Sequence, residues 1–283
     1  MKYLRLSLLL AVFAAFSIGC AALDERQRTW IFQPSDRSWG SSGELANGMD
    51  TVWIDFQSKV TGEPVKLHGL WLASDAFKSV KSAKSPVLLY LHGARWNVEG
   101  SANRIRRMQE LGFSVLAIDY RGFGKSSKSL PSEAMAYEDA RAAWEWLAAN
   151  HADAPRYIFG HSLGGAIAIE LAAQVPDEAG TIVEGTFTSI SDVFNSFKWG
   201  WLPVNALITQ RFQAADKVGK IGSPLLVVHG TQDSTIRPEL GRKLFDAAVE
   251  PKALVMVEGG SHHNTNAVGQ SLYREALAKL FKL

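Results

Sequence analysis

Residues 157–172 read YIFGHSLGGAIAIELA, and this stretch decides the fold. It begins with three apolar residues typical of a buried strand and ends in a run typical of a helix. Between them lies a Gly-x-Ser-x-Gly box with Ser162 at its centre, the pattern of a nucleophile elbow that presents a serine on a sharp turn. Side chains at Gly160 and Gly164 would collide with the flanking strand and helix, so both positions require glycine.

Short apolar runs recur along the chain and predict the rest of the sheet. Continuous apolar strands indicate burial on both faces, as in a parallel sheet covered by helices. Alternating stretches at 52–56 and 67–72 instead predict an antiparallel hairpin. The continuous runs are 87–91, 114–118, 157–159, 181–183, 225–228 and 253–257.

Helical segments lie between these runs. Residues 132–150 carry apolar side chains at helical spacing, and Ser132 can cap the first turn. Alternating strands and helices predict an α/β fold, a doubly wound, mostly parallel eight-stranded sheet over residues 50–283.

Reactive side chains stand where these strands end. In open parallel sheets, functional residues gather just past the carboxyl ends of the strands. Candidates at such positions are His92, Asp119, Ser162, Glu184, Asp233, His262 and His263.

At this point the chain resembles the α/β-hydrolase superfamily of serine hydrolases, in particular its small-lid, esterase and lysophospholipase-like group. The shared motifs are the His-Gly after the strand at 87–91, DYRGFGKS at 119–126, the box around Ser162, and Gly-Gly-Ser-His at 259–262. The resemblance covers about residues 50–283. The nucleophile–acid–histidine order along the chain also agrees with that fold.

A serine hydroxyl needs a base, and the base needs a carboxylate to orient it. The resemblance implies Ser162 as nucleophile and His262 as base, with the neighbouring His263 as the alternative. It implies Asp233 as the acid, with Glu184 as the runner-up because some members place the acid one strand earlier. It also implies that His161, inside the box, points away from the proton path.

Two backbone amides are expected to form the oxyanion hole. Leu163 follows the nucleophile and supplies one of them. The resemblance implies Ala94, after His92 and Gly93, as the other. The sequence has neither His-Glu-x-x-His nor Cys-x-x-Cys, so we expect no metal, and we expect no cofactor.

The first residues predict export. Lys2 and Arg5 precede an apolar run that ends at Ile18, which is short for a membrane span, so residues 1–19 are interpreted as a signal peptide. Cys20, the only cysteine, stands where a bacterial lipobox places a diacylated residue. The alternative is a plain secretory signal with an incidental cysteine.

The remaining organisation follows from composition. Residues 20–49 are polar and mixed, and we interpret them as a tether and an N-terminal arm. Residues 187–220 leave room for a small lid, whose aromatic side chains either pack in the lid or form an apolar acyl pocket or membrane-facing rim. The formal net charge is +2 and falls to zero without the leader, which gives no reason to expect a nucleic-acid partner.

Together these features predict an exported, lipid-anchored serine hydrolase that cleaves a carboxylic ester or thioester through an acyl-enzyme. Its partners would be a small-molecule ester or lipid substrate and the membrane that holds the anchor. Its location would be the bacterial cell envelope, on the periplasmic face of the outer membrane in a Gram-negative cell. The alternatives are a serine peptidase of the same fold and a non-catalytic envelope lipoprotein.

Overall fold

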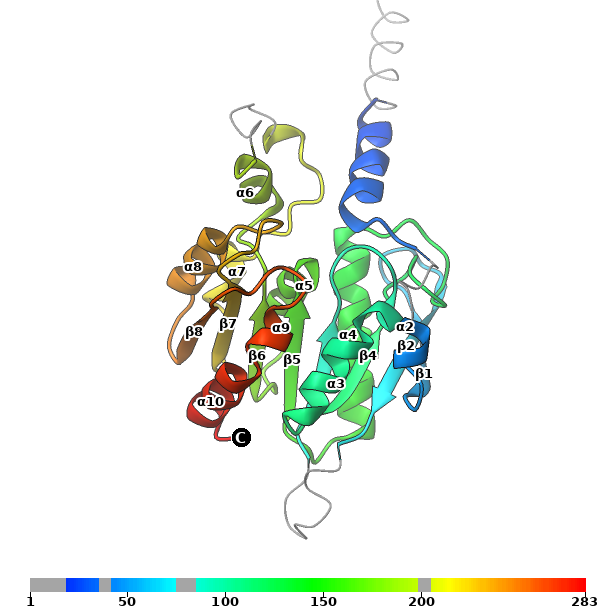
Figure 1. Cartoon of the computed structure of the whole chain (residues 1–283). Coiled ribbons are helices and arrows are strands. Elements are labelled where there is room, and N and C mark those ends of the chain that lie inside the picture. Colours follow the sequence, from blue (N-terminus) through cyan, green and yellow to red (C-terminus); the bar gives the residue numbers. More distant parts are fainter. Residues whose placement is uncertain (1–18, 36–41, 75–84, 198–204) are drawn as a thin grey trace, which may run out of the picture.

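The computed structural model describes residues 19–35, 42–74, 85–197 and 205–283, and these build one eight-stranded sheet flanked by helices (Figure 1). The strand order is β1-β2-β4-β3-β5-β6-β7-β8. The strands are β1 (Asp50–Gln57), β2 (Pro64–Leu72), β3 (Val87–Leu91), β4 (Ser114–Ile118), β5 (Arg156–His161), β6 (Gly180–Glu184), β7 (Leu225–Gly230) and β8 (Lys252–Val257). The predicted eight-stranded, doubly wound sheet is confirmed.

The direction of the strands follows the apolar pattern. Strands β1 and β2 form the predicted antiparallel hairpin, and β2 also pairs antiparallel with β4. All other neighbours are parallel. Every residue of β3, β4, β6 and β7 is buried, whereas β1 alternates because it lies at an edge. Continuous apolar runs therefore became central strands, since both of their faces are covered. The run at 253–257 is the exception, because it forms the edge strand β8 and is mostly half-buried.

Helices cover both faces of the sheet. The longer ones are α3 (Ala102–Glu110), α4 (Glu133–Asn150), α5 (Leu163–Ala172), α8 (Pro238–Ala247) and α10 (Gln270–Phe281). Side chains of α4, α5 and α8 pack in one apolar core, and those of α3 and α10 pack in a second core on the opposite face. The predicted cap is present, because the Ser132 hydroxyl accepts a hydrogen bond from the backbone amide of Met135.

The segment expected to be a tether is partly a helix. Residues 19–32 are helical and project from the end of the sheet where the parallel strands finish (Figure 1). The polar composition suggested a tether, but alanine, leucine, glutamate, glutamine and arginine are all good helix formers. Arg28 donates hydrogen bonds to the carbonyls of Leu130 and Pro131, which ties this helix to the domain.

This helix bears on the predicted anchor. Cys20 lies within it and is exposed. The leader before residue 19 lies outside the described residues. Among the residues that the structure describes, no helix is both long and apolar enough to cross a bilayer.

The predicted lid region contains only short elements among its described residues. These are α6 (Ile190–Asn195), the 3-10 turn η2 (Asn205–Leu207) and α7 (Ala215–Val218). Phe197, within the same region just after α6, is half-exposed. The aromatic residues Trp199 and Trp201, together with Leu202, fall outside the described residues.

A buried charge network joins the loop after β4 to α4. The Arg121 guanidinium donates to the carboxylates of Asp139, at 2.8 Å, and Glu138, at 2.6 Å. It also donates to the Ser58 hydroxyl at the end of the hairpin, at 2.9 Å. Burial raises the pKa of Asp139 to about 7, although the Arg121 charge acts in the opposite direction. Because water does not reach the Asp139 carboxylate, its charge is stabilised by Arg121 and not by solvent.

We predict that Arg121→Met lowers the free energy of unfolding by about 3–5 kcal/mol, because it leaves a buried carboxyl without its partner. Urea denaturation of the purified chain measures the loss. The double variant Arg121→Met/Asp139→Leu removes both charges and should recover much of it. An equal loss in the double variant would show that the contact between the two charges is not the cause.

Candidate active site

Ser162 stands on the predicted turn between β5 and α5. Its backbone has φ 55° and ψ −122°, a strained conformation for a residue other than glycine. A Cβ at Gly160 would lie 2.2 Å from the carbonyl oxygen of Gly164, and one at Gly164 would lie 2.1 Å from that of Leu91. The two glycines therefore permit the close packing of helix on strand that this turn requires, as the sequence predicted.

His262 reaches the serine. Its Nε2 lies 3.0 Å from Ser162 Oγ, and its Nδ1 lies 2.8 Å from Asp233 Oδ2. His262 is buried, whereas His263 is exposed and packs edge-to-face against the ring of His262. Of the two histidines, the structure thus places the one chosen from the Gly-Gly-Ser-His motif beside Ser162.

Asp233 is held as a carboxylate by several donors. It follows β7, and its Oδ1 accepts hydrogen bonds from the backbone amides of Thr235 and Ile236. Burial favours the neutral acid, but contacts with His229 and His262 and these amides outweigh it and hold the pKa of Asp233 well below its usual range. Asp233 is therefore ionised at neutral pH, so it can orient His262 and balance a positive charge on it.

Glu184, the runner-up for the acid, lies in a different environment. Its carboxylate accepts a hydrogen bond from Arg104 Nε at 2.9 Å and another from the Tyr273 hydroxyl. Arg104 also donates to the backbone carbonyl of His263. Glu184 is completely buried. The structure thus brings Asp233, and not Glu184, to the ring of His262.

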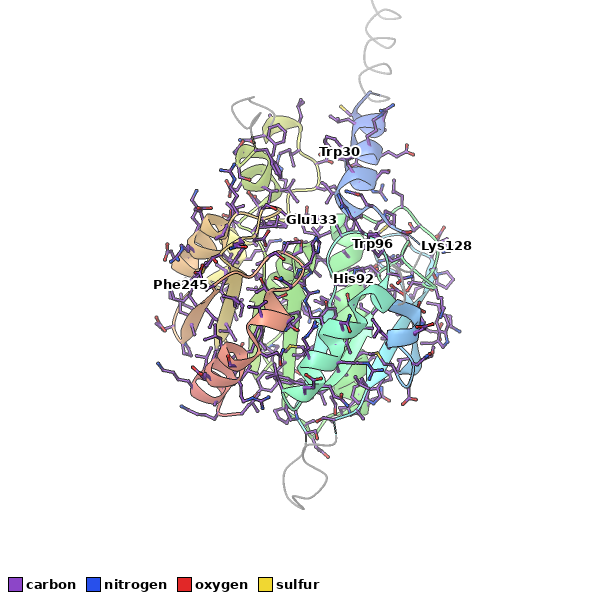
Figure 2. The ribbon with its side chains drawn as sticks, in the orientation of Figure 1. Trp30, His92, Trp96, Lys128, Glu133 and Phe245 are labelled. Carbon is purple, nitrogen blue, oxygen red and sulfur yellow. The ribbon has the colours of Figure 1, made fainter. Side chains whose placement is uncertain are left out.

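The predicted oxyanion donors flank Ser162. Leu163 is the first residue of α5. On the other side, a Cβ at Gly93 would lie 3.0 Å from Cβ of Ser162, so the backbone that leads into Ala94 runs directly against the serine. Arg95 and Trp96 follow with φ of 72° and 62°. Figure 2 shows His92 and Trp96 at the end of the sheet below the helix of residues 19–32.

His161 contributes a contact that the sequence did not reveal. Its ring centroid lies 4.8 Å from that of His262, and its Nε2 lies 3.0 Å from the His262 carbonyl oxygen. Burial lowers the pKa of His161 well below its ordinary value, and the positive charge of Arg104 acts in the same direction. The neutral ring donates its Nε2 proton to this carbonyl, so it supports the backbone of His262 and does not compete for the Ser162 proton.

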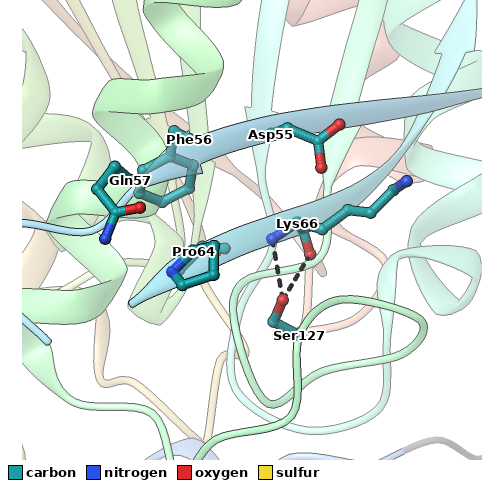
Figure 3. Close-up of a pocket in the computed structure, with 7 residues that line it drawn as sticks. Asp55, Phe56, Gln57, Pro64, Lys66 and Ser127 are labelled. Carbon is teal, nitrogen blue, oxygen red and sulfur yellow. Dashed lines mark hydrogen bonds between the residues drawn. The ribbon is translucent and has the colours of Figure 1, made fainter. Parts of the chain in front are cut away.

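Two other features of the described residues bear on ligands. A shallow hollow of about 360 Å³ lies at the hairpin, where the Ser127 hydroxyl bonds to the backbone of Lys66 (Figure 3). It is lined by β1, β2 and Ser127, and not by Ser162 or His262. Within the described ranges, no group of three or more His, Cys, Asp or Glu side chains is arranged to hold a metal ion.

Comparison with known proteins places the chain among hydrolases. The family model described as serine aminopeptidase, S33, matches residues 82–216. An uncharacterized protein of Mycobacterium tuberculosis is 32% identical over 257 residues, which cover 90% of this chain and 86% of that protein.

A second relative and one solved structure add to this. The lysophosphatidylserine lipase ABHD12 of Danio rerio is 33% identical over 66% of this chain, and this chain spans about half of that lipase's length (54%). The crystal structure of the Pyrococcus furiosus esterase Pf2001 superposes with a TM-score of 0.66 at 17% identity, covering 89% of this chain and 97% of the esterase, which shows a shared fold.

The pH dependence of stability tests the burial of His161. The folded chain keeps this ring neutral while the unfolded chain protonates it near pH 6.5, so stability is lost as the pH falls below about 6.5. We predict that between pH 7 and pH 5 the variant His161→Gln loses about 2 kcal/mol less unfolding free energy than the parent chain. Urea unfolding at both pH values measures this. His92, also buried with a lowered pKa, contributes equally to both proteins. Parallel pH profiles would contradict the prediction.

Proposed function

We propose that this chain, a member of the α/β-hydrolase superfamily, is a serine hydrolase that cleaves carboxylic esters through an acyl-enzyme intermediate. The observation that carries the proposal is the continuous row of contacts from Ser162 Oγ to His262 Nε2 and from His262 Nδ1 to Asp233. This is the arrangement that activates a serine hydroxyl in enzymes of unrelated folds.

The first half of the reaction acylates the serine. Ser162 Oγ attacks the ester carbonyl carbon as its proton passes to His262 Nε2. The positive charge that forms on His262 is stabilised by the ionised Asp233 at 2.8 Å. When the tetrahedral intermediate collapses, His262 gives this proton to the departing alkoxide oxygen, and the alcohol leaves.

The second half repeats these steps with water. His262 takes a proton from a water molecule, whose oxygen attacks the acyl carbon, and the tetrahedral intermediate breaks its bond to Ser162 Oγ. His262 returns the proton to Ser162 as the carboxylic acid leaves. In both halves the backbone amides of Leu163 and Ala94 are proposed to hold the negative oxygen, because Leu163 follows Ser162 and Gly93, the residue before Ala94, lies against it.

The substrate is proposed to be an ester with a short or medium acyl chain, with a lysophospholipid as the secondary candidate. The named activity of the lysophosphatidylserine lipases supports this class. So does the aromatic composition of the short lid, since each buried methylene of an acyl chain contributes about 0.8 kcal/mol. The match to the serine aminopeptidase family model makes the amino-terminal peptide bond of a peptide the alternative substrate.

The anchor is also a proposal. We infer that residues 1–19 are removed and that Cys20 carries two acyl chains at the new N-terminus. Its support is the basic, then apolar leader and the exposure of Cys20. Attachment through Cys20 would hold the enzyme on the cell envelope, in a Gram-negative cell on the periplasmic face of the outer membrane.

Replacing the nucleophile tests the function. The parent chain should hydrolyse p-nitrophenyl esters, best at about four to eight acyl carbons. Ser162→Ala should lower kcat about a million-fold with the fold preserved, because only one oxygen is lost. Labelling with a fluorophosphonate should likewise disappear. Undiminished ester hydrolysis by the variant would refute the proposal, and cleavage of aminoacyl p-nitroanilides alone would favour the peptidase.

Substitutions of Asp233 and Glu184 should have very different effects on kcat. We predict that Asp233→Asn lowers kcat about ten-thousand-fold, because the amide no longer stabilises the charged His262. Glu184→Gln, the matched control, should stay within about tenfold of the parent kcat while it loses about 3 kcal/mol of unfolding free energy. Initial rates and urea denaturation of both variants provide the comparison. Equal losses of kcat would show that Asp233 does not act as the sole acid.

The anchor has its own test. Mass spectrometry of the protein extracted from membranes should find an N-terminal Cys20 carrying two acyl chains, because two chains are needed for stable attachment. Cys20→Ser should remain unprocessed or become soluble, with unchanged rates on soluble esters. An unmodified Cys20, or cleavage at another position, would overturn the anchor and leave the proposed chemistry intact.

A further inference from the structure

A short segment between the N-terminal helix and the main domain crosses next to the active site. We call residues 32–35 the strap. Its Phe32 side chain is completely buried, whereas Trp30, two residues earlier, is 78% exposed. The chain therefore passes from solvent into the core at the strap. In the sequence, the strap lies more than a hundred residues before Ser162.

The strap bonds to the two residues that directly follow Ala94. The backbone amide of Arg95 donates to the carbonyl oxygen of Phe32 at 2.8 Å. Pro34 then forms a parallel β-bridge with Trp96.

The loop needs such support because its backbone is strained. Arg95 and Trp96 have φ of 72° and 62°, in the left-handed region that side chains other than glycine disfavour. Residues of this kind persist only where the surrounding structure holds them, at about 1–3 kcal/mol each. Two in succession immediately after a predicted oxyanion donor require an external hold, and the strap supplies two backbone contacts to them.

Phe32 fixes the strap to the core and is linked through Phe123 to the start of the same loop. Its ring lies edge-to-face with Phe212 at 5.7 Å and with Phe123 at 6.4 Å. Phe123 in turn packs edge-to-face against His92 at 5.0 Å, where the loop leaves β3. Both ends of residues 92–96 are therefore held by one cluster that includes the strap.

We propose that the strap is a positioning segment of the active site, in which Phe32 and Pro34 hold residues 95–96 so that Gly93 and Ala94 stay against Ser162. The catalytic consequence rests on the proposed function, since Ala94 serves there as an oxyanion donor. Neither Phe32 nor Pro34 touches the reacting atoms, so both are positioning residues.

Two variants test this in the full-length protein. Phe32→Ala removes the anchor of the strap, and Pro34→Gly loosens the bridge to Trp96 while it leaves the core filled. Phe113→Ala is the matched control, because Phe113 is equally buried but belongs to the core on the other face of the sheet. All rates are measured at a temperature where circular dichroism shows each variant folded.

The first readout does not depend on catalysis. Amide hydrogen exchange in peptides covering residues 92–98 should become about tenfold faster in both strap variants and remain unchanged in Phe113→Ala. The second readout is kinetic. In the strap variants, kcat on a soluble ester should fall about ten- to a hundredfold while KM changes little, because the lost geometry matters only to the transition state.

A third measurement separates positioning from general loosening. Affinity for an alkyl boronic acid, which forms a tetrahedral adduct on the serine, should fall by the same factor as kcat/KM. Unchanged exchange in both strap variants, or an equal loss of kcat in Phe113→Ala, would overturn the proposal. Faster exchange with a full kcat would confirm the mechanical role and refute the catalytic one. If the parent chain cleaves no ester, the proposed function fails. The hydrogen-exchange rates alone then decide whether the strap holds residues 92–98.

Discussion

The close approach of α5 to strands β3 and β5 is the constraint on which the site depends. Two positions without side chains, Gly160 and Gly164, allow the backbone of the helix to lie against the backbone of the sheet. Any Cβ there would meet a carbonyl oxygen at little more than 2 Å, which no rotamer change can relieve. This contact fixes the turn at Ser162, aims the N-terminus of α5 toward the same point, and brings the chain after β3 to the other side of the serine.

Strand register explains why one carboxylate faces the histidine and the other does not. Glu184 pairs with His161 at the last position of the β5–β6 ladder, so it is still part of its strand and not of the loop that follows. Its side chain is directed into the core shared by α3 and α10, where Arg104 and Tyr273 enclose it. Asp233 instead follows β7 in a turn, where its carboxylate can approach the histidine loop from the side. Arg104 reaches that loop as well, through the His263 carbonyl, so the excluded acid still contributes to its support.

Most of the fold could be predicted from the sequence because it follows from local pattern. Continuous apolar runs mark strands buried on both faces, and the glycines of the box mark a backbone contact that admits no alternative. The position of His262 followed from its motif.

Other features depend on residues that meet only in the folded chain. The contact of His161 with the carbonyl of His262 has no local signal. The helix at 19–32 was predicted as a tether because of its polar, mixed composition, although its residues are good helix formers. The pairing of Pro34 with Trp96 joins segments about sixty residues apart, and no periodicity indicates it.

The helix of residues 19–32 limits how far a lipid at Cys20 could lie from the active site. From residue 20 to residue 32 it rises about 18 Å, at about 1.5 Å for each residue, and its hydrogen bonds to the carbonyls at 130–131 prevent it from acting as a free leash. A lipid attached at Cys20 would therefore keep the serine within a few nanometres of the bilayer. An enzyme attached in this way would act mainly on substrate molecules in the membrane leaflet that holds it. Its turnover in the cell would then follow the surface density of substrate in that leaflet rather than the concentration of substrate in the surrounding fluid.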